Sequence, residues 1–535
     1  MTWTCLAPLA AALFCCGFFA FRQALHLFQL SSYQDGSYLK AVKAHKKDFR
    51  NIRRILPCIV MLLGAVSFSS MPWMTLAGML LYLLLNRPKK AKKPLVYTAR
   101  VKRLLCCAGI LAVLWLLLLN YASTCLLYAA LVRQSAALAR WSLLLPVLAV
   151  VLTILWEHRM VLLCNDLMSP IEHAISQHYY KDAQRILESM PELTVIGITG
   201  SYGKTSTKYF LERLLSLRYN VYMTPGNYNT TLGVVRAVRE GLRPTHQIFL
   251  CEMGARHVGD IAEICQLVHP SMGIITSVGP QHLDTFGTLT NVLNTKLELA
   301  AAVKGKGPVF LNFDSVPLAN HAPQQQVISY GQEGVHYHLS DLRIDENGSC
   351  FTVTAPDGQR QSFSTRLLGQ ANVQNICGAI AVANTLDIPL APLAPAVRQL
   401  EGAPHRLQLL RQPGLTIIDD AYNSNPAGAK NALETLALCR GLRIAVTPGL
   451  VELGEQEQEY NEALGRQAAA CCHWLITVGD QPRTEAIRQG AREGGLHRER
   501  ILEAKTVQQA MELARGLPAE EGRFVLLLND LTDNY

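Results

Sequence analysis

Four long apolar stretches fill the first third of the chain and restrict its fold more than any other feature. They span residues 2–21, 55–86, 104–132 and 142–156. A helix that crosses a bilayer needs roughly 20 apolar residues, and few are shorter than about 17. Apolar stretches of this length, separated by basic loops, favour transmembrane helices over a soluble core. The first stretch has no basic segment before it and no evident cleavage site after it, so we expect an anchor rather than a signal peptide.

The basic residues between these stretches predict how the chain is threaded. Loops 22–54 and 87–103 are both rich in Lys and Arg. Such loops stay on the cytoplasmic side of a membrane, so an even number of crossings must separate them. Stretch 55–86 is long for one helix and short for two. We therefore expect it to form a tight hairpin that turns near residues 69–72.

Two further apolar runs, 104–120 and 141–156, form a second pair that returns the chain to the cytoplasm before Asn165. This arrangement gives five crossings with the N-terminus outside. The alternative is four crossings, because the last run is short for a span. In either case we predict that residues 1–166 are a multi-pass region of the cell membrane, in contact with membrane lipids. The catalytic part would lie in the cytoplasm.

Charge divides the chain at the same boundary. The formal net charge is +9, but residues 1–166 contain 19 Lys and Arg against 4 Asp and Glu, and the remainder contains 31 against 37. The excess positive charge lies in loops between apolar runs, whereas binding of nucleic acid requires it on a folded surface. Nucleic acid is therefore not an expected partner. The 15 cysteines show no Cys-x-x-Cys spacing, which argues against a zinc ribbon or a thioredoxin-like site.

Residues 167–190 are predicted to form a connector helix. Ser169 is a suitable N-cap, Pro170 suits the first helical position, and Glu172 can complete a capping box. The apolar positions of this helix are typical of ordinary packing, so we assign it no catalytic role.

A glycine-rich loop, Thr-Gly-Ser-Tyr-Gly-Lys-Thr-Ser at 199–206, follows an apolar run at 193–198 and precedes a helical segment at 208–217. Glycines let backbone N–H groups wrap a phosphate, and the start of the next helix adds its dipole. In such loops the lysine, here Lys204, reaches the terminal phosphates, and the hydroxyl of Thr205 binds Mg²⁺. The order of strand, loop and helix predicts a nucleotide site, although an isoleucine replaces the first glycine of the common eight-residue pattern.

This loop resembles the ATP loop of the Mur ligase family and of its folylpolyglutamate synthetase relatives. Within the family, the longer string at 197–208 most resembles the branch that adds D-alanyl-D-alanine. The resemblance covers about 192–460 and includes, in the family's order, Thr-Pro-Gly-Asn-Tyr-Asn-Thr-Thr-Leu-Gly at 224–233, Glu-Met-Gly-Ala at 252–255, Gly-Pro-Gln-His at 279–282, Lys-Leu-Glu at 296–298, Gly-Gln-Ala-Asn-Val-Gln-Asn at 369–375, Asp-Asp-Ala-Tyr-Asn-Ser-Asn-Pro at 419–426 and Val-Glu-Leu-Gly-Glu at 451–455.

The resemblance implies the fold class: an α-helical transmembrane region followed by α/β domains. A P-loop Mur ligase central domain, which binds ATP, is expected over 191–395. A smaller, Rossmann-like Mur ligase C-terminal domain is expected over 400–535.

The resemblance also implies an ATP-dependent carbon–nitrogen ligase that activates a carboxylate as an acyl phosphate and forms ADP and phosphate. The catalytic residues would be Lys204, Glu252, His282 and Lys296. Two Mg²⁺ ions are expected, with Thr205 and Glu252 at the first ion and His282 at the second. The resemblance further implies that Lys296 is carbamylated.

The remaining site residues implied by the resemblance contact ATP or the acceptor substrate. The ATP contacts would be Gly200, Ser201, Gly203, Lys204, Thr205, Ser206, Asn375, Arg406, Asp420, Tyr422 and Asn423. The substrate loop would contribute Asn227, Asn229, Thr230 and Thr231. Arg406 follows His405, where the family usually has a glycine. Asp420, Tyr422 and Asn423 are expected to approach the nucleotide when the domains close.

Two family features are missing. Apolar stretches stand where the family has its UDP-gripping domain, and the usual Lys-Gly-Ser near the C-terminus is replaced. The zinc-binding insert of the lipid II amidating relative is also missing. We expect the acceptor to be a muramyl peptide or a lipid-linked precursor in peptidoglycan synthesis, and the amine to be an amino acid or a dipeptide.

Two alternatives to this function stay open. One is a ligase similar to poly-γ-glutamate synthase. The other is a membrane protein whose Mur-like domain only binds nucleotide, as a regulator or a transport partner. Lys204, Glu252, His282 and Lys296 together favour chemistry, because binding alone does not need all four.

Overall fold

The chain forms two compact units, Met1–Gln177 and His178–Leu531. The structure is a computed structural model, and it describes residues 3–31, 33–44, 51–64, 70–87, 94–345, 347–422, 425–520 and 522–529.

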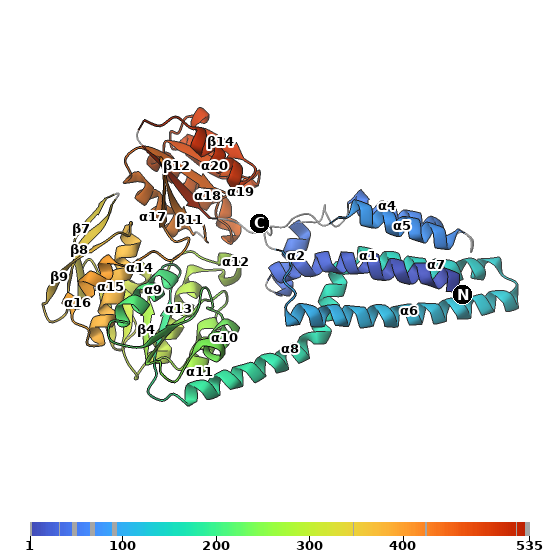
Figure 1. Cartoon of the computed structure of the whole chain (residues 1–535), viewed down its shortest axis with the longest axis horizontal. Coiled ribbons are helices and arrows are strands. Elements are labelled where there is room, and N and C mark those ends of the chain that lie inside the picture. The colour runs from blue at the N-terminus through green and yellow to red at the C-terminus, as the bar shows by residue number, and fades with distance from the viewer. Residues whose placement is uncertain are drawn as a thin grey trace. The chain divides into compact units, whose positions relative to one another are not determined.

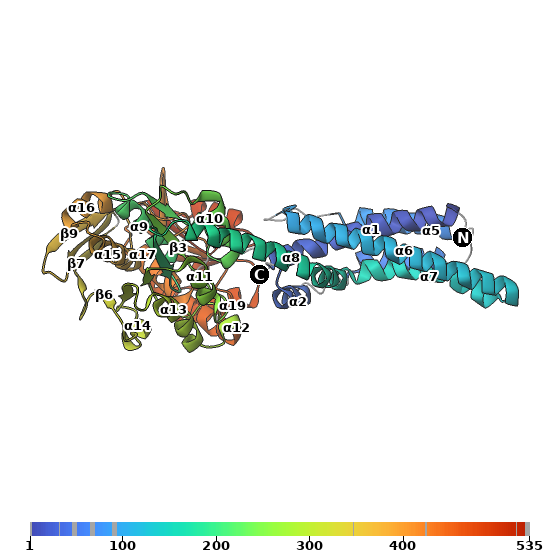
Figure 2. The ribbon, with the colours of Figure 1, turned by 90° about the horizontal axis from the view of Figure 1, so that it is seen from below.

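The described part of the N-terminal unit is helical, and most of its helices are apolar. They are α1 (Trp3–Leu30), α2 (Asp35–Ala44), α4 (Ile52–Gly64), α5 (Met71–Leu85), α6 (Ala99–Arg133), α7 (Ala136–Leu155) and the first part of α8 (Glu157–Glu188). Helix α6 packs along α7, α4 packs along α5, and α1 contacts α5 and α7 (Figures 1 and 2). Two clusters of buried apolar side chains hold this bundle together.

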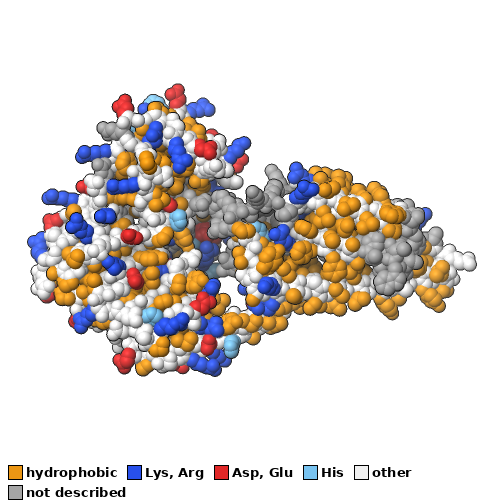
Figure 3. Space-filling model, in the orientation of Figure 1, with side chains coloured by type: hydrophobic (Ala, Val, Ile, Leu, Met, Phe, Trp, Pro, Cys, Tyr) orange, Lys and Arg blue, Asp and Glu red, His pale blue; other side chains and the backbone are white. Residues whose placement is uncertain are grey.

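Three of these helices are long and apolar enough to cross a membrane: Ala10–Leu30, Ala99–Arg133 and Ala137–Leu155. Met71–Leu85 is apolar but shorter. Many large apolar side chains on this unit face outward, and Figure 3 shows them covering its visible face. Outward apolar surface of this extent is typical of contact with lipid. The number of crossings remains a prediction, and part of the expected turn at 69–72 lies outside the described residues.

The connector helix begins earlier than the sequence predicts. Helix α8 starts at Glu157, so Ser169 and Pro170 lie inside it rather than at its N-terminus. Glu172 does not close a capping box there; its carboxylate accepts hydrogen bonds of 2.6 and 2.8 Å from the guanidinium of Arg103. The physical reason is tertiary. Val161 is buried in the N-terminal unit, and this packing extends the helix through a proline that removes only one backbone hydrogen bond.

The second unit contains two sheets, of which the larger belongs to the central domain. Its nine strands lie in the order β2-β3-β1-β4-β5-β6-β7-β8-β9. They are β1 (Thr194–Thr199), β2 (Val221–Met223), β3 (Ile248–Glu252), β4 (Met272–Ile275), β5 (Val309–Asn312), β6 (Val327–Gly331), β7 (Tyr337–Asp345), β8 (Gly348–Thr354) and β9 (Arg360–Thr365). Neighbours from β2 to β7 pair in parallel, and β7-β8-β9 pair antiparallel. The chain order reverses around β1, and ligands of open α/β sheets bind beyond the carboxyl ends of strands at such a point.

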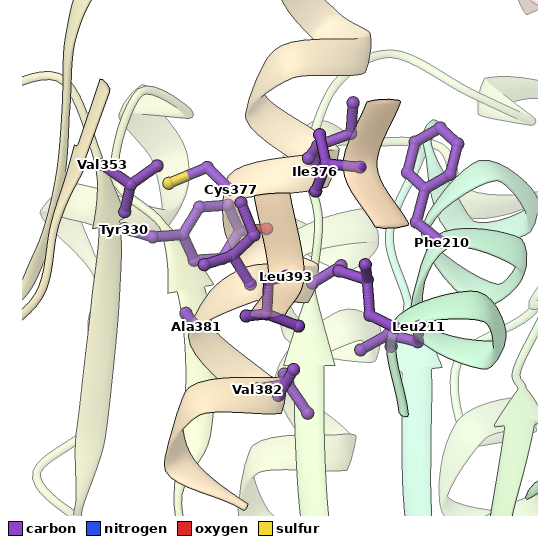
Figure 4. Packing of buried hydrophobic residues seen from close by; sticks show 14 of the residues in the cluster. Phe210, Leu211, Tyr330, Val353, Ile376, Cys377, Ala381, Val382 and Leu393 are labelled. Carbon is purple, nitrogen blue, oxygen red and sulfur yellow. The ribbon is translucent and has the colours of Figure 1, made fainter. Parts of the chain in front are cut away.

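Helices cover both faces of this sheet. They are α9 (Lys204–Leu215), α10 (Thr231–Gly241), α11 (Asp260–Val268), α12 (Leu283–Phe286), α13 (Leu289–Val303), α14 (Val316–Asn320), α15 (Gln370–Thr385) and α16 (Leu390–Arg398). Helices α9, α15 and α16 share one buried core, and α10, α11 and α13 share the other. Figure 4 shows Phe210 and Leu211 of α9 near Ile376 and Val382 of α15 in the first core.

The smaller sheet belongs to the C-terminal domain. Its strands, in the order β10-β11-β15-β12-β13-β14, are β10 (Gln408–Gln412), β11 (Leu415–Asp420), β12 (Leu442–Thr447), β13 (Trp474–Val478), β14 (Ile501–Ala504) and β15 (Arg523–Leu528). Only β10 pairs antiparallel. The helices are α17 (Pro426–Ala437), α18 (Glu457–Cys471), α19 (Pro482–Glu493) and α20 (Val507–Gly516). The predicted fold class, apolar helices followed by two α/β domains, is confirmed.

The packing of α9 gives a test of the central core. Phe210 is fully buried beneath the phosphate-loop helix. We expect Phe210→Ala to lower the free energy of unfolding by about 3–5 kcal/mol, since it removes apolar burial and leaves a cavity. Heat-induced unfolding of the detergent-solubilised full-length protein measures this change. Leu217→Ala, at an exposed position just after α9, is the matched control and should leave the midpoint almost unchanged.

Candidate active site

The phosphate loop leaves the carboxyl end of β1 and requires its two glycines. Gly200 has φ +148° and Gly203 has φ +83°, both in the region that favours glycine. A Cβ atom on Gly200 would lie 2.1 Å from Thr276 Oγ1, and one on Gly203 would lie 2.5 Å from Asn375 Oδ1. Neither position can hold a side chain without movement of its neighbours. The loop is therefore shaped by close packing against β4 and α15.

Lys204 begins α9 and curls back over the loop. Its Nζ donates to Gly200 O at 2.6 Å and to Ser201 O at 3.4 Å. Burial lowers the pKa of Lys204 to about 8, the Glu252 charge raises it, and the Arg406 charge lowers it. A phosphate oxygen offers this ammonium group a stronger acceptor than the loop carbonyls do.

Glu252, at the end of β3, is a buried carboxylate held by three side chains. Its Oε1 accepts from Thr205 Oγ1 at 3.1 Å and from Asn229 Nδ2 at 3.0 Å. Lys208 Nζ lies 2.9 Å from Oε2. Burial alone would raise the pKa of Glu252, but the charges of Lys208 and Lys204 outweigh it and hold the pKa below its usual value. The carboxylate is therefore ionised at neutral pH.

Lys208 is a site residue that the sequence analysis missed. It is fully buried, and besides Glu252 its Nζ donates to Thr224 O at 2.8 Å and to Gly226 O at 2.7 Å. It therefore ties β3 to the loop that carries Asn227 and Asn229. The only signal in the sequence was a lysine one helical turn after Lys204, which by itself is typical of an exposed helix face.

The groups around Glu252 fit a magnesium ion. The Thr205 hydroxyl and the Glu252 carboxylate are hard oxygen donors 3.1 Å apart beside the phosphate loop. Within the described parts of the chain, no three His, Cys, Asp or Glu side chains gather as a dedicated metal cluster. This composition matches Mg²⁺, which usually keeps several waters and takes only one or two carboxylates plus substrate phosphates.

Lys296 lies on α13, and only 1% of its surface is exposed. Burial and the charge of Lys204 together lower its pKa to about 7, against the opposing charges of Asp260 and Glu298. Its Nζ has no hydrogen-bond or ion-pair partner among the residues that the structure describes. A buried lysine of this kind presents a substantial fraction of neutral, nucleophilic amine near neutral pH.

A polar cavity of about 310 Å³ is lined by residues of both α/β domains. The central domain contributes Gly203, Ser206 and Asn375, and the C-terminal domain contributes Arg406 and Asp420. Residues separated by some 200 positions in the sequence thus share one cavity, as the sequence analysis expected for the nucleotide site.

Tyr422 provides a second link between these domains. The guanidinium of Arg406 lies 4.4 Å from the centre of its ring, and its hydroxyl accepts from Asn227 Nδ2 at 2.9 Å. The predicted substrate loop and the C-terminal turn that is predicted to contact ATP therefore meet. The neighbouring Asn423, also predicted to contact ATP, lies outside the described residues.

The conformation at Arg406 explains why a glycine is expected before it. His405 has φ +58°, a left-handed conformation that favours glycine. The imidazole partly compensates, because its Nδ1 lies 2.7 Å from Asp419 Oδ2. On the next carboxylate, burial raises the pKa of Asp420 to about 7, while the Arg406 charge and a hydrogen bond from Leu407 N oppose the shift.

His282, which follows β4, contacts the C-terminal domain. Its Nδ1 makes an ion-pair contact with Glu452, which also lies 3.4 Å from Arg256 NH2. Both His282 (φ +50°) and Glu452 (φ +62°) adopt left-handed backbone conformations. Such strain clusters at functional sites. Glu452 falls within the string Val-Glu-Leu-Gly-Glu at 451–455, for which the sequence predicts no site role.

Four further residues predicted for the site also have defined places in the structure. Ser201 holds the loop, because its N–H donates to Ser277 O and its hydroxyl donates to Gly279 O, so both groups are engaged within the protein. Thr230 caps α10 by accepting from Gly233 N, and Thr231 is the first residue of that helix. Ser206 lines the cavity.

Comparison with protein families identifies two domains. The profile described as Mur ligase middle domain matches residues 198–383, and that described as Mur ligase, glutamate ligase domain matches 405–529. The UDP-N-acetylmuramoyl-tripeptide–D-alanyl-D-alanine ligase of Bacillus subtilis is 30% identical over 314 residues, 58% of this chain and 65% of that protein. The Mycobacterium tuberculosis ligase of that name is 34% identical over 315 residues, covering 56% and 61%. The chain thus spans less than two thirds of these relatives.

Solved structures give a similar result. The MurF ligase from Thermotoga maritima in complex with ADP matches with a TM-score of 0.60 and 27% identity, over 66% of this chain and 80% of that one. MurF from Acinetobacter baumannii matches with a TM-score of 0.59 and 27% identity, over 66% and 77%.

The Lys208–Glu252 pair can be tested by a double-mutant cycle. Lys208→Met leaves a buried carboxylate without its cation and should lower the free energy of unfolding by about 3–5 kcal/mol. Lys208→Met combined with Glu252→Gln should recover much of this loss, because no unpaired charge remains. Unfolding midpoints give the stability, and a fluorescent ATP analogue reports nucleotide binding. Additive losses in the double variant would contradict the coupling.

Proposed function

Because the chain carries the middle and C-terminal domains of the Mur ligase family, we propose that it is an ATP-dependent carbon–nitrogen ligase of peptidoglycan precursor synthesis. The observation that carries this proposal is the polar cavity lined by Gly203 and Ser206 of the phosphate-loop region and by Arg406 and Asp420 of the C-terminal domain. A domain that only bound nucleotide would not need a second domain's cation and carboxylate at the phosphates.

The first step activates the acceptor. An acceptor carboxylate oxygen attacks the γ-phosphorus of ATP, the bond from that phosphorus to the ADP oxygen breaks, and an acyl phosphate forms. Lys204 and Arg406 would stabilise the charge that spreads over the transferring phosphoryl group. Mg²⁺, held by Thr205 and Glu252 with the phosphates, would supply further neutralising charge. The ADP in the Thermotoga maritima relative supports the use of ATP.

The second step forms the amide. The neutral amine of the second substrate attacks the acyl carbon, phosphate leaves, and the amine loses a proton to the medium. Water must be kept from the acyl phosphate, or it is hydrolysed. The contacts of Asn227 with Tyr422 and of His282 with Glu452 support a closed form of the two domains that limits access of water.

Lys296 is proposed to act as a carbamate. Its neutral amine attacks the carbon of CO₂, a nitrogen–carbon bond forms, and one proton is released, which leaves an anion where a cation stood. Burial in a site that already holds Lys204 favours this exchange, because the buried ammonium of Lys296 is destabilised. The carbamate anion would help to position the Mg²⁺ ions beside the phosphates. His282 would help to hold the second of these ions.

The names of the relatives indicate the substrates. Their amine is D-alanyl-D-alanine and their acceptor is a UDP-linked muramoyl tripeptide. We propose the same peptide chemistry here on a membrane-anchored acceptor, such as a lipid-linked muramyl peptide. Apolar helices occupy the N-terminal part of this chain, and its basic loops can attract anionic headgroups. An acceptor confined to a membrane would reach the enzyme at raised effective concentration.

Two substitutions test the chemistry. Lys204→Ala should abolish ATP turnover, because a central positive charge is lost where water cannot replace it. Lys296→Ala should retain much of the ATP binding and lose product formation, with partial rescue by added short carboxylic acids. Mass spectrometry of the product and binding of a fluorescent ATP analogue separate the two effects. Full activity of Lys296→Ala would refute the carbamate role.

The carbamate also has a pH signature. The folded-state pKa of Lys296 is lowered to about 7, so the reactive neutral amine increases as the pH rises through that value. An exposed lysine reaches this state only near pH ~10.4. Incorporation of ¹³C-bicarbonate, followed by ¹³C NMR, should therefore increase from pH 6 to pH 8 (about one unit on each side of that pKa) in the wild type. Lys296→Ala should lack this signal.

The acceptor is tested with full-length protein in nanodiscs. Lipid-linked and UDP-linked muramyl tripeptides are offered together with ATP and D-alanyl-D-alanine, and both products are quantified. We expect the lipid-linked acceptor to be ligated faster, because it shares the bilayer with the enzyme. Equal or faster ligation of the UDP-linked acceptor would exclude the membrane-anchored proposal. Lys204→Ala serves as the inactive control.

A further inference from the structure

An apolar cavity lies among α1, α6, α7 and the first turns of α8, within the N-terminal unit. Its volume is about 450 Å³, inside the range of about 300–1,000 Å³ that is typical of ligand sites. Its walls carry the aromatic side chains of Phe14, Phe18, Trp115 and Trp156, all of which are exposed on this unit. The cavity is therefore accessible from the apolar surface.

Small residues on facing helices create the hollow. Gly17 of α1 and Ala108, Gly109 and Ala112 of α6 all line it. A Cβ atom built on Gly109 would meet no neighbouring atom within 4 Å. Small residues normally let membrane helices approach closely, but here the space beside Gly109 stays open. A larger side chain at this position can thus fill the cavity without a clash.

The cavity lies at one end of the predicted spans. On α1 it is lined from Phe14 onward, on α6 from Leu105 to Trp115, and on α7 and α8 from Leu152 onward. These segments adjoin loops 22–54 and 87–103, which carry the basic residues that favour the cytoplasmic side. The cavity therefore belongs to the cytoplasmic half of the membrane.

One charged side chain belongs to the lining of the cavity. Glu157 lines it, is 2% exposed and makes an ion-pair contact with Arg54. Charged side chains are costly in the hydrocarbon centre of a bilayer and are found near the interface or paired within the protein. Glu157 is paired with Arg54 in this way, and the lining around it is almost entirely apolar.

We propose that this cavity binds the isoprenoid chain of a polyprenyl-linked acceptor, which rests on the proposed function of the chain as a ligase for a membrane-anchored carboxylate. The opening is on the apolar surface, the lining segments adjoin the basic loops 22–54 and 87–103, and the walls are aromatic and aliphatic. One chain with a cytoplasmic headgroup satisfies all three. A phospholipid would have to splay its two chains to place one of them there.

The test uses full-length protein in phosphatidylglycerol nanodiscs and a polyprenyl phosphate that carries a diazirine. After photolysis, labelled peptides are mapped by mass spectrometry. We expect labels on α1, α6 and α7 around the cavity, and we expect unlabelled polyprenyl phosphate to compete. Competition by added phosphatidylglycerol to the same extent, or labels spread over the outer faces of the helices, would overturn the proposal.

Two matched substitutions sharpen the test. Gly109→Phe should reduce labelling at least roughly tenfold, which corresponds to about 1.4 kcal/mol, because the phenyl ring occupies the space that the isoprenoid chain would fill. Ile110→Phe adds similar bulk to the adjacent, 62% exposed position on the outer face and should leave labelling unchanged. Unchanged labelling in Gly109→Phe would also overturn the proposal. Ala108→Leu fills the same cavity more gently and decides the outcome if Gly109→Phe is not folded.

The readout does not depend on ligation. Labelling reports occupancy of the cavity, whereas the competition between lipid-linked and UDP-linked acceptors reports the substrate of the ligase. Binding of ATP by the Gly109→Phe protein shows that its catalytic domains are intact. Failure of the cavity proposal and failure of the proposed function can therefore be told apart.

Discussion

The active site depends on one buried carboxylate. Glu252 ends the third strand in a position that is 1% exposed, and it is stable there as an anion only because Lys208, Thr205 and Asn229 surround it. A buried charge without such partners would be neutralised or would destabilise the domain. Each partner comes from a different segment of the site. Thr205 belongs to the phosphate loop, Asn229 belongs to the substrate loop, and Lys208 ties the two together through Thr224 and Gly226. The carboxylate thus fixes the phosphate loop relative to the loop that carries Asn227 and Asn229.

The same site concentrates positive charge. Burial and the charge of Lys204 lower the pKa of Lys296, and burial and the charge of Arg406 lower the pKa of Lys204. Two buried lysines that repel each other are unfavourable without a ligand. A triphosphate, or conversion of Lys296 to an anion, removes this repulsion. The domain is therefore arranged to gain electrostatic stabilisation when ATP binds, which is the arrangement that phosphoryl transfer requires.

The sequence predicted the parts of this site that local chemistry determines. The phosphate loop was recognisable because glycines, a lysine and a hydroxyl follow a buried strand, and the structure explains both glycines by contacts with Thr276 and Asn375. The start of α8 was wrong, because Ser169 and Pro170 are local signals and the burial of Val161 is not. Lys208 and Glu452 were missed for the same reason. Their partners, Glu252 and His282, lie 44 and 170 positions away along the chain, and only the folded sheet brings them together.

The N-terminal unit changes how an enzyme of this family could obtain binding energy. A soluble nucleotide-linked substrate is held by polar contacts to its nucleotide, each of which replaces contacts with water and gives a modest net gain. When a hydrocarbon chain leaves water, its burial contributes about 0.8 kcal/mol per CH₂ group. A chain that is already inside a bilayer does not gain this energy on binding, because lipid is as apolar as the protein. Selection of one lipid chain over another must then come from shape. A cavity created by Gly17, Gly109 and two alanines supplies shape rather than apolar surface. A side chain added at Gly109 therefore changes the shape of the cavity and affects recognition. A change of apolar area on the outer faces of the helices does not alter that shape.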